Sequence, residues 1–150
     1  MMKPVLTALT AALSLLAVAQ ETAPTVSLSL PKSVKAGQEF KAKVKITFAD
    51  GLHGYSNPPT SEFLNPVKVS VFDKVFALDG AVYPRGEDKE VAGERTRVYE
   101  GTIEIELTLR APKKEGKPTL GIKLNYQQCN DNTCFPPSSL TLRSPVTVAK

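Results

Sequence analysis

An alternation of apolar and polar residues with a period of two constrains this chain more than any other feature. In residues 40–48 every second side chain is apolar, and the lysines and the threonine between them are polar. Successive side chains of a strand point to opposite faces of a sheet, so this segment predicts a strand with one buried and one solvent-exposed face. The same period recurs in residues 26–30, 67–71, 103–109 and 120–126.

A last strand is expected around Leu140 and Leu142, and Pro145 separates it from Val146 and Val148. Proline has no N–H to donate to a sheet ladder, so this strand should lie at an edge or carry a bulge. Turns rich in Gly, Pro, Asn and Asp separate the segments, and no helical stripe is present. The pattern predicts an all-β, immunoglobulin-like antiparallel β-sandwich of about seven to nine strands, with a small barrel as the alternative.

Two long polar connections interrupt the strand pattern, one over residues 56–66 and one over residues 84–97. We expect both to be loops. Long loops on a rigid sandwich often carry binding or catalytic residues. Each is therefore a candidate to border a functional site.

The amino terminus has the pattern of a secretory signal peptide. Lys3 precedes an apolar run over residues 5–18, which ends in a small-x-small cleavage pattern at residues 17–19. The run has about 14 residues, whereas a membrane-spanning helix needs roughly 20. We expect residues 1–19 to be removed and residues 20–150 to be one soluble, exported domain, periplasmic or otherwise extracytoplasmic, that does not insert into a membrane.

Charge and motifs exclude several classes of function. The formal net charge of +4 includes Lys3 of the leader, and the other charges are scattered over the strands. So small a surplus predicts no nucleic-acid partner and no binding to a membrane surface.

The single histidine, His53, is expected at a loop or strand end rather than in catalysis, and Tyr55 and Tyr126 are expected in the core or at its rim.

The two cysteines, Cys129 and Cys134, carry the most specific chemistry in the sequence. In an oxidising compartment two thiols this close should be able to form a disulfide. Residues 130–133 are turn formers, so the strand over residues 120–126 and a return strand from Ser138 would set the cysteines opposite each other. The bond would then lie exposed near a turn, within reach of another protein's thiolate.

Spacing alone leaves both a stapling and a redox-active disulfide open. In the chain-entropy model, closing a loop of about six residues contributes roughly 2 kcal/mol, against about 4.7 kcal/mol for a loop of about 100 residues. A staple here would therefore constrain little. The absence of Cys-x-x-Cys excludes a thioredoxin or haem-attachment motif, and two thiols with one histidine are too few for a structural zinc site. Two thiolates could hold Cu(I), which leaves copper handling as a third alternative.

The residues around the cysteines read Tyr126-Gln127, Cys129, a short polar loop, Cys134 and Phe135-Pro136-Pro137. This pattern resembles the amino-terminal periplasmic domain family of the thiol:disulfide interchange protein DsbD, and the aromatic-Pro-Pro is its most specific element. Asp50-Gly51 followed by Tyr55, and the loop over residues 86–99, recur in that family at comparable distances. The likeness therefore covers the chain from about Val26 onward.

The resemblance implies an immunoglobulin-like sandwich whose cysteine pair cycles between dithiol and disulfide. The resemblance implies that such a domain is a component of a protein-disulfide reductase. It would take electrons from a membrane thiol relay or thioredoxin-like donor and pass them to oxidised periplasmic acceptors of thioredoxin fold, as in cytochrome c biogenesis. It would need no cofactor. By analogy Cys134 forms the mixed disulfide with the acceptor and Cys129 resolves it. Because the chain ends at Lys150, the relay is expected on separate polypeptides. The competing class is a non-catalytic binding or scaffold module in which the disulfide only pins a hairpin.

Family members shield the pair with a cap loop of two acidic residues and an aromatic, and the best match here is Lys89-Glu90-Val91. Glu90 keeps one acid and is a candidate modulator of proton transfer. The smaller Val91 predicts weaker shielding, with Tyr99 or Phe135 as substitutes. Four residues separate the cysteines, one fewer than in the best-known member. The candidate site residues are thus the catalytic pair Cys129 and Cys134, with Glu90, Val91, Tyr99, Tyr126 and Phe135 as modulators or cap residues.

Overall fold

The computed structural model describes residues 21–150, and within them every regular element is a strand, with no helix that is long and apolar enough to cross a membrane. In chain order the strands are β1 (Thr25–Ser29), β2 (Val34–Lys35), β3 (Glu39–Thr47), β4 (His53–Tyr55), β5 (Lys68–Val71), β6 (Ala77–Val82), β7 (Glu87–Val91), β8 (Glu94–Tyr99), β9 (Thr102–Arg110), β10 (Thr119–Tyr126), β11 (Gln128–Cys129), β12 (Ser138–Pro145) and β13 (Val148–Ala149). The signal peptide expected over residues 1–19 lies outside the described residues. The strands outnumber the expected seven to nine partly because β2, β4, β11 and β13 have only two or three residues each, too few for an alternation to be visible.

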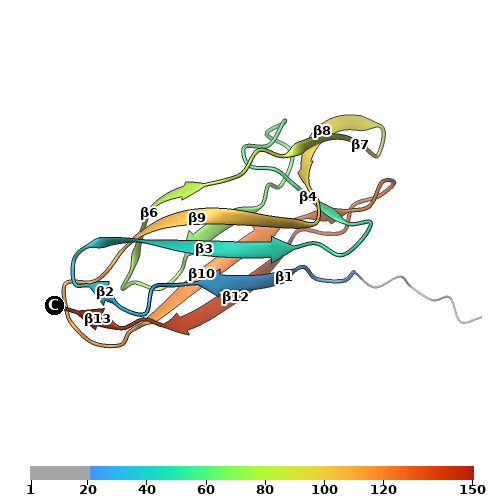
Figure 1. Ribbon diagram of the computed structural model, residues 1–150. Helices are drawn as coiled ribbons and strands as arrows, with labels where there is room; N and C mark the ends of the chain where they lie inside the picture. Colours follow the sequence, from blue (N-terminus) through green and yellow to red (C-terminus); the bar gives the residue numbers. More distant parts are fainter. Residues whose placement is uncertain (1–20) are drawn as a thin grey trace, which may run out of the picture.

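Two antiparallel sheets form the body of the sandwich, one in the order β1-β3-β9-β6 and the other in the order β12-β10-β5. Figure 1 shows the long strands of both sheets running along the molecule in two layers. Val44 of β3, Ile105 of β9 and Ile122 of β10 are fully buried in the one core that the sheets share. The two sheets share no strand, so the predicted immunoglobulin-like sandwich is confirmed and the barrel alternative is wrong.

The strand pair β3 and β9 shows how the period of two builds this layer. Ala42, Val44 and Ile46 point into the core, and the lysines between them face glutamates of β9 across the ladder, as in the register pair Lys43 and Glu106. Opposite charges at such cross-strand positions contribute roughly 0.2–1 kcal/mol each. The pattern in the sequence therefore specifies both the buried and the solvated face.

The last predicted strand divides at Pro145, where β12 ends. β12 is an edge strand of its sheet, as the missing N–H of proline requires. Beyond it, Val148 of β13 pairs in parallel with Val34 of β2. Val34, Val146 and Val148 are all buried and close that end of the core.

A third sheet, in the order β11-β4-β8-β7, lies at one end of the sandwich, where Figure 1 shows the β7–β8 hairpin projecting above the long strands. The expectation that residues 84–97 form a loop is wrong, because β7 and β8 pair from Glu87 to Val98. Ala92 and Gly93 form the turn with φ values of 48° and 84°, and two positive φ values match the twist of a hairpin. Polar side chains cover most of this hairpin, which conceals its strand pattern in the sequence. Residues 56–66 do form a strandless connection, as expected.

Candidate functional site

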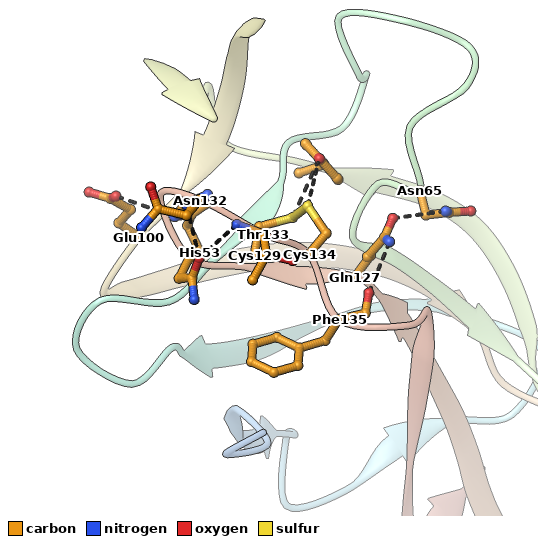
Figure 2. Close-up of a disulfide and its surroundings, with 11 residues drawn as sticks. His53, Asn65, Glu100, Gln127, Cys129, Asn132, Thr133, Cys134 and Phe135 are labelled. Atoms are coloured by element: carbon orange, nitrogen blue, oxygen red, sulfur yellow. Dashed lines mark hydrogen bonds and ion pairs between the residues drawn. A yellow bond between two sulfur atoms is a disulfide. The ribbon is translucent and has the colours of Figure 1, made fainter. Parts of the chain in front are cut away.

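Cys129 and Cys134 form a disulfide, with 2.03 Å between their sulfur atoms, at the end of the sandwich that carries the third sheet. The hairpin of β10 and β12 brings them together, and the two cysteines pair with each other in an isolated antiparallel bridge. Asn130 Oδ1 accepts hydrogen bonds from the backbone N–H groups of Asn132 and Thr133, at 2.9 and 2.8 Å, and this fixes the turn between the cysteines. Figure 2 shows this turn and the disulfide behind it. The predicted hairpin geometry is confirmed.

The two cysteines differ in exposure. Cys129 is 1% exposed because Tyr55, Val91 and Val98 pack around it, whereas Cys134 is half-buried. The expectation of an exposed bond is therefore wrong for the Cys129 side. Another molecule can approach the disulfide in this conformation only from the side of Cys134.

A small apolar cluster covers the disulfide. Tyr55, Val91 and Val98 are buried around Cys129, and Leu64 and Cys134 pack against them. Val91 is the last residue of β7 and is 3% exposed. Leu64 belongs to the connection over residues 56–66, so both long polar segments of the sequence contribute one apolar residue to the cover.

Of the candidate modulators, only Val91 lies against the disulfide. Glu90 is exposed and pairs in register with Arg95. Tyr99 and Tyr126 are buried in the main core, and the hydroxyl of Tyr99 donates a hydrogen bond of 2.7 Å to the carbonyl oxygen of Pro84. Figure 2 shows the ring of Phe135 turned away from the sulfur atoms. Tyr99 and Phe135 therefore do not replace a cap aromatic in this structure, and that expectation is wrong.

Tyr55 touches both sulfur atoms, a contact that the sequence did not reveal. Its hydroxyl oxygen lies 3.3 Å from Sγ of Cys134 and 3.4 Å from Sγ of Cys129. Burial, with a smaller contribution from the charge of Glu94, raises the pKa of Tyr55. The phenol therefore stays protonated at neutral pH and can donate a hydrogen bond to a thiolate. Its position in the short strand after Asp50-Gly51 is the only signal that could have suggested this role.

An ion-pair network joins the hairpin of β7 and β8, hereafter the cap hairpin, to the turn between the cysteines. Lys89 Nζ lies 3.2 Å from Oδ1 of Asp131 and also pairs with Glu100. Hydrogen bonds to Glu100 and then Asp131 raise the pKa of Lys89. The backbone N–H of Ala92 donates to the carbonyl oxygen of Asp131 at 3.2 Å. The cap hairpin is thus tied to the cysteine turn by one ion pair and one backbone hydrogen bond.

His53 begins β4, at a strand end as expected, but it is 1% exposed. It stands directly opposite Cys129 in the ladder between β4 and β11. Its Nδ1 lies 3.8 Å from Oε1 of Glu100, and neither ring nitrogen has a hydrogen-bond partner within the described residues. Burial and then the charge of Lys89 lower the pKa of His53, and the carboxylates of Glu100 and Asp131 act against this. The imidazole is therefore neutral at neutral pH.

No group of three or more His, Cys, Asp or Glu side chains within residues 21–150 could hold a metal ion. The chemistry that this geometry supports is that of the sulfur atoms: a covered disulfide with one approachable sulfur, a phenol between the sulfur atoms and a neutral imidazole beside the buried cysteine.

Comparisons with known proteins place this site in context. The family model of the thiol:disulfide interchange protein DsbD, N-terminal, matches residues 20–144. The N-terminal periplasmic domain of ScsB from Proteus mirabilis superposes with a TM-score of 0.61 at 16% identity, over 82% of this chain and 46% of that chain, so this chain spans about half of that one. The DsbD N-terminal domain of Neisseria meningitidis in the reduced form superposes with a TM-score of 0.52 at 21% identity, over 83% of this chain and 86% of that one.

No curated protein sequence gives a significant match. The two structural likenesses lie below 25% identity and show the shared fold. The family model covers most of the chain, including the disulfide, the cap hairpin and the strands that position them. This chain therefore belongs to the DsbD N-terminal domain family.

Proposed function

We propose that this domain is an extracytoplasmic thiol-disulfide interchange domain that passes reducing equivalents through Cys129 and Cys134. The observation that carries the proposal is the unequal exposure of the two cysteines, 1% for Cys129 against half-buried for Cys134. A bond that served only as a staple would need no approachable sulfur. Family membership supports the same role, because the family belongs to a disulfide reductase system.

In the reaction, the Cys134 thiolate attacks one sulfur of an acceptor disulfide, and the other acceptor sulfur leaves with the electron pair of the broken bond. Cys129 then loses its proton and attacks Sγ of Cys134, which releases the second acceptor sulfur as a thiolate. Two electrons pass to the acceptor and the domain is left with its disulfide. Thiolates are the attacking species in each exchange.

Tyr55 supports the first step, because its protonated hydroxyl lies within 3.3 Å of Sγ of Cys134. A hydrogen bond to a charged acceptor contributes about 1.5–3 kcal/mol. The phenol therefore favours the thiolate of Cys134 over its thiol. The cap hairpin would have to move for a large acceptor to reach the sulfur, because Val91 packs against the same cluster.

Family membership and the predicted leader support the proposed direction, location and partners. We infer a reductive role in the periplasm, with electrons supplied by a membrane thiol relay or thioredoxin-like donor. The acceptors would be oxidised periplasmic proteins of thioredoxin fold, including those that serve cytochrome c biogenesis. The leader predicted over residues 1–19 supports export.

The reduction potential of the cysteine pair tests the proposal. Residues 20–150 are equilibrated in thiol-disulfide buffers and the free thiols are trapped with a mass-tagged alkylating agent. Exchange-active pairs have potentials of roughly −120 to −270 mV, whereas structural disulfides lie below about −300 mV. A value in the upper range supports interchange. A value below about −300 mV, with no exchange toward a thioredoxin-fold protein, would indicate a binding module with a pinned hairpin.

The roles of the two cysteines are tested by single substitutions. In Cys129→Ser, the remaining Cys134 should trap an acceptor as a stable mixed disulfide. In Cys134→Ser, the buried Cys129 should trap far less. Equal trapping by the two variants would contradict the assignment of Cys134 as the entry sulfur.

A further inference from the structure

The buried imidazole of His53 is a titratable group at the site that the interchange reaction, as described so far, does not use. A polar side chain that is 1% exposed and has no hydrogen-bond partner among residues 21–150 is unfavourable unless another state of the protein gives it one. We propose that His53 accepts the proton of the Cys129 thiol when Cys129 resolves the mixed disulfide. This inference rests on the proposed interchange function and names the residue that completes its second step.

The sheet register places the two groups together. His53 and Cys129 are direct partners in the antiparallel ladder of β4 and β11. Residues directly opposite each other have side chains on one face, with Cβ atoms about 4.5–5.5 Å apart. Tyr55, two residues along β4, shares that face and has its hydroxyl against both sulfur atoms. The imidazole therefore lies on the same face as the disulfide, on the side of the buried cysteine.

The oxidation state shown here explains the missing hydrogen bond. In the disulfide, Sγ of Cys129 has no proton to share. Reduction creates an S–H group on the residue opposite His53, and a neutral imidazole nitrogen can accept it. The imidazole is neutral because burial lowers the pKa of His53, so it is able to take a proton at neutral pH.

A route leads the proton from His53 to water. Nδ1 of His53 lies 3.8 Å from Oε1 of Glu100, whose side chain is 39% exposed. Glu100 and Lys89 line a surface hollow of about 280 Å³. Figure 2 shows Glu100 beside His53 at the outer edge of the site. The buried acceptor is thus one carboxylate away from solvent.

Charged groups of both signs surround the imidazole. Lys89 of β7 disfavours the imidazolium, whereas Glu100, which follows β8, and Asp131 of the cysteine turn favour it. Lys89 is itself paired with both carboxylates. A proton that reaches His53 therefore meets one cation and two carboxylates.

In the proposed step, the S–H bond of Cys129 breaks and its proton passes to the free imidazole nitrogen. The sulfur electron pair forms the bond from Cys129 Sγ to Cys134 Sγ. The bond between Cys134 Sγ and the acceptor sulfur breaks, and the acceptor leaves as a thiolate. The imidazolium then returns its proton through Glu100 to water or to that thiolate. No oxidant beyond the acceptor disulfide is required.

Dithiobis-nitrobenzoate separates the two steps, because each releases one coloured thiolate from the reduced domain. The first release is bimolecular and reports attack by Cys134. The second is unimolecular, does not depend on reagent concentration, and reports resolution by Cys129. In His53→Phe we expect a second release at least about tenfold slower at neutral pH, since a positioned base contributes about 10²–10⁴-fold. Its pH profile should move to higher pH, and the first release should stay within about twofold of the wild type.

Gln128→Met is the matched control. Gln128 is also fully buried beside Cys129 and has an unpartnered Oε1, but it cannot accept a proton at neutral pH. Its second release should match the wild type. His53→Gln provides a second non-titrating variant if His53→Phe folds poorly, and folding is checked by circular dichroism of the oxidised proteins.

The wild type offers an independent readout, because His53 is the single histidine of the chain and its imidazole signal in NMR spectra is unambiguous. The titration of this signal should differ between the oxidised and reduced domains. An unchanged second release in both His53 variants at every pH would overturn the role of His53 alone. A reduced wild type that gives no first release would instead overturn the interchange function.

Discussion

Val91 is the residue whose truncation should most directly show that the cap hairpin controls access to the disulfide. It is 3% exposed and packs in the cluster of Tyr55, Val98 and Cys129. Val91→Ala removes two methyl groups from that cluster, worth about 1.6 kcal/mol at about 0.8 kcal/mol per buried carbon. If reduction proceeds from a locally opened hairpin, the open population rises by about fifteenfold. Val91→Phe should act in the opposite direction, because a larger side chain shields the bond more.

The assay is the rate at which dithiothreitol or glutathione reduces the oxidised domain, followed by the thiols that appear. Low urea concentrations distinguish local opening from global unfolding, since local opening exposes little surface and its rate rises little with urea. Glu90→Ala is the matched control, because Glu90 is adjacent in β7 but exposed. Equal reduction rates for the wild type, Val91→Ala and Val91→Phe would refute the reasoning, since the sulfur would then be reached without moving the hairpin.

Three further predictions concern the charged and polar groups of the site. Lys89→Gln breaks the ion pair with Asp131 and should accelerate reduction of the disulfide by about two- to fivefold at low salt. In high salt the ion pair of the wild type is screened, so the wild type and the variant should be reduced at the same rate. In a Cys129→Ser background, Tyr55→Phe should raise the pKa of the Cys134 thiol by about one unit or more, measured from the pH dependence of alkylation; an unchanged profile would show that the phenol does not stabilise the thiolate. Burial lowers the pKa of His53 in the folded state, so just below a pH of about 6.5 the unfolded chain binds more protons than the folded chain does. The free energy of unfolding must therefore fall as the pH falls through this range. His53→Phe should remove this part of the pH dependence in urea unfolding curves, and a variant that keeps the wild-type slope would contradict the assignment.

The long strands could be predicted from the sequence because each has one buried and one solvent-exposed face. The predicted ranges 40–48 and 103–109 lie within one residue of β3 and β9 at each end. The cap hairpin could not be predicted in the same way. Its strands bury few side chains, among them Val91, Thr96 and Val98, so the period of two is broken by polar residues on both faces. Backbone pairing and a two-residue turn hold it instead, and neither leaves an apolar pattern.

Of the site, only the disulfide between Cys129 and Cys134 could be predicted from the sequence. Two cysteines beyond the end of a strand, with turn formers between them, are enough to predict a hairpin disulfide. The side chains around the disulfide come from β4, β7, β8 and the connection over residues 56–66, and only tertiary packing brings these segments together. Tyr55 and His53 therefore looked like ordinary core or strand-end residues, and Tyr99 and Phe135 looked nearer to the disulfide than they are.

The cap hairpin, the cysteine turn and His53 of β4 lie on separate elements. This separation sets the order in which they can act. Of the two strands of the cap hairpin, β7 is the edge strand of the sheet and β8 pairs with β4, which in turn pairs with β11. The turn end of the cap hairpin is held to the cysteine turn by one ion pair and one hydrogen bond, so it can open without breaking the ladder of β4 and β11. Opening then exposes Cys134 while His53 stays opposite Cys129. Substitutions at Val91 should therefore change the rate of entry alone, and substitutions at His53 should change the rate of resolution alone. The double variant should show each effect on its own step, with the same size as in the single variant.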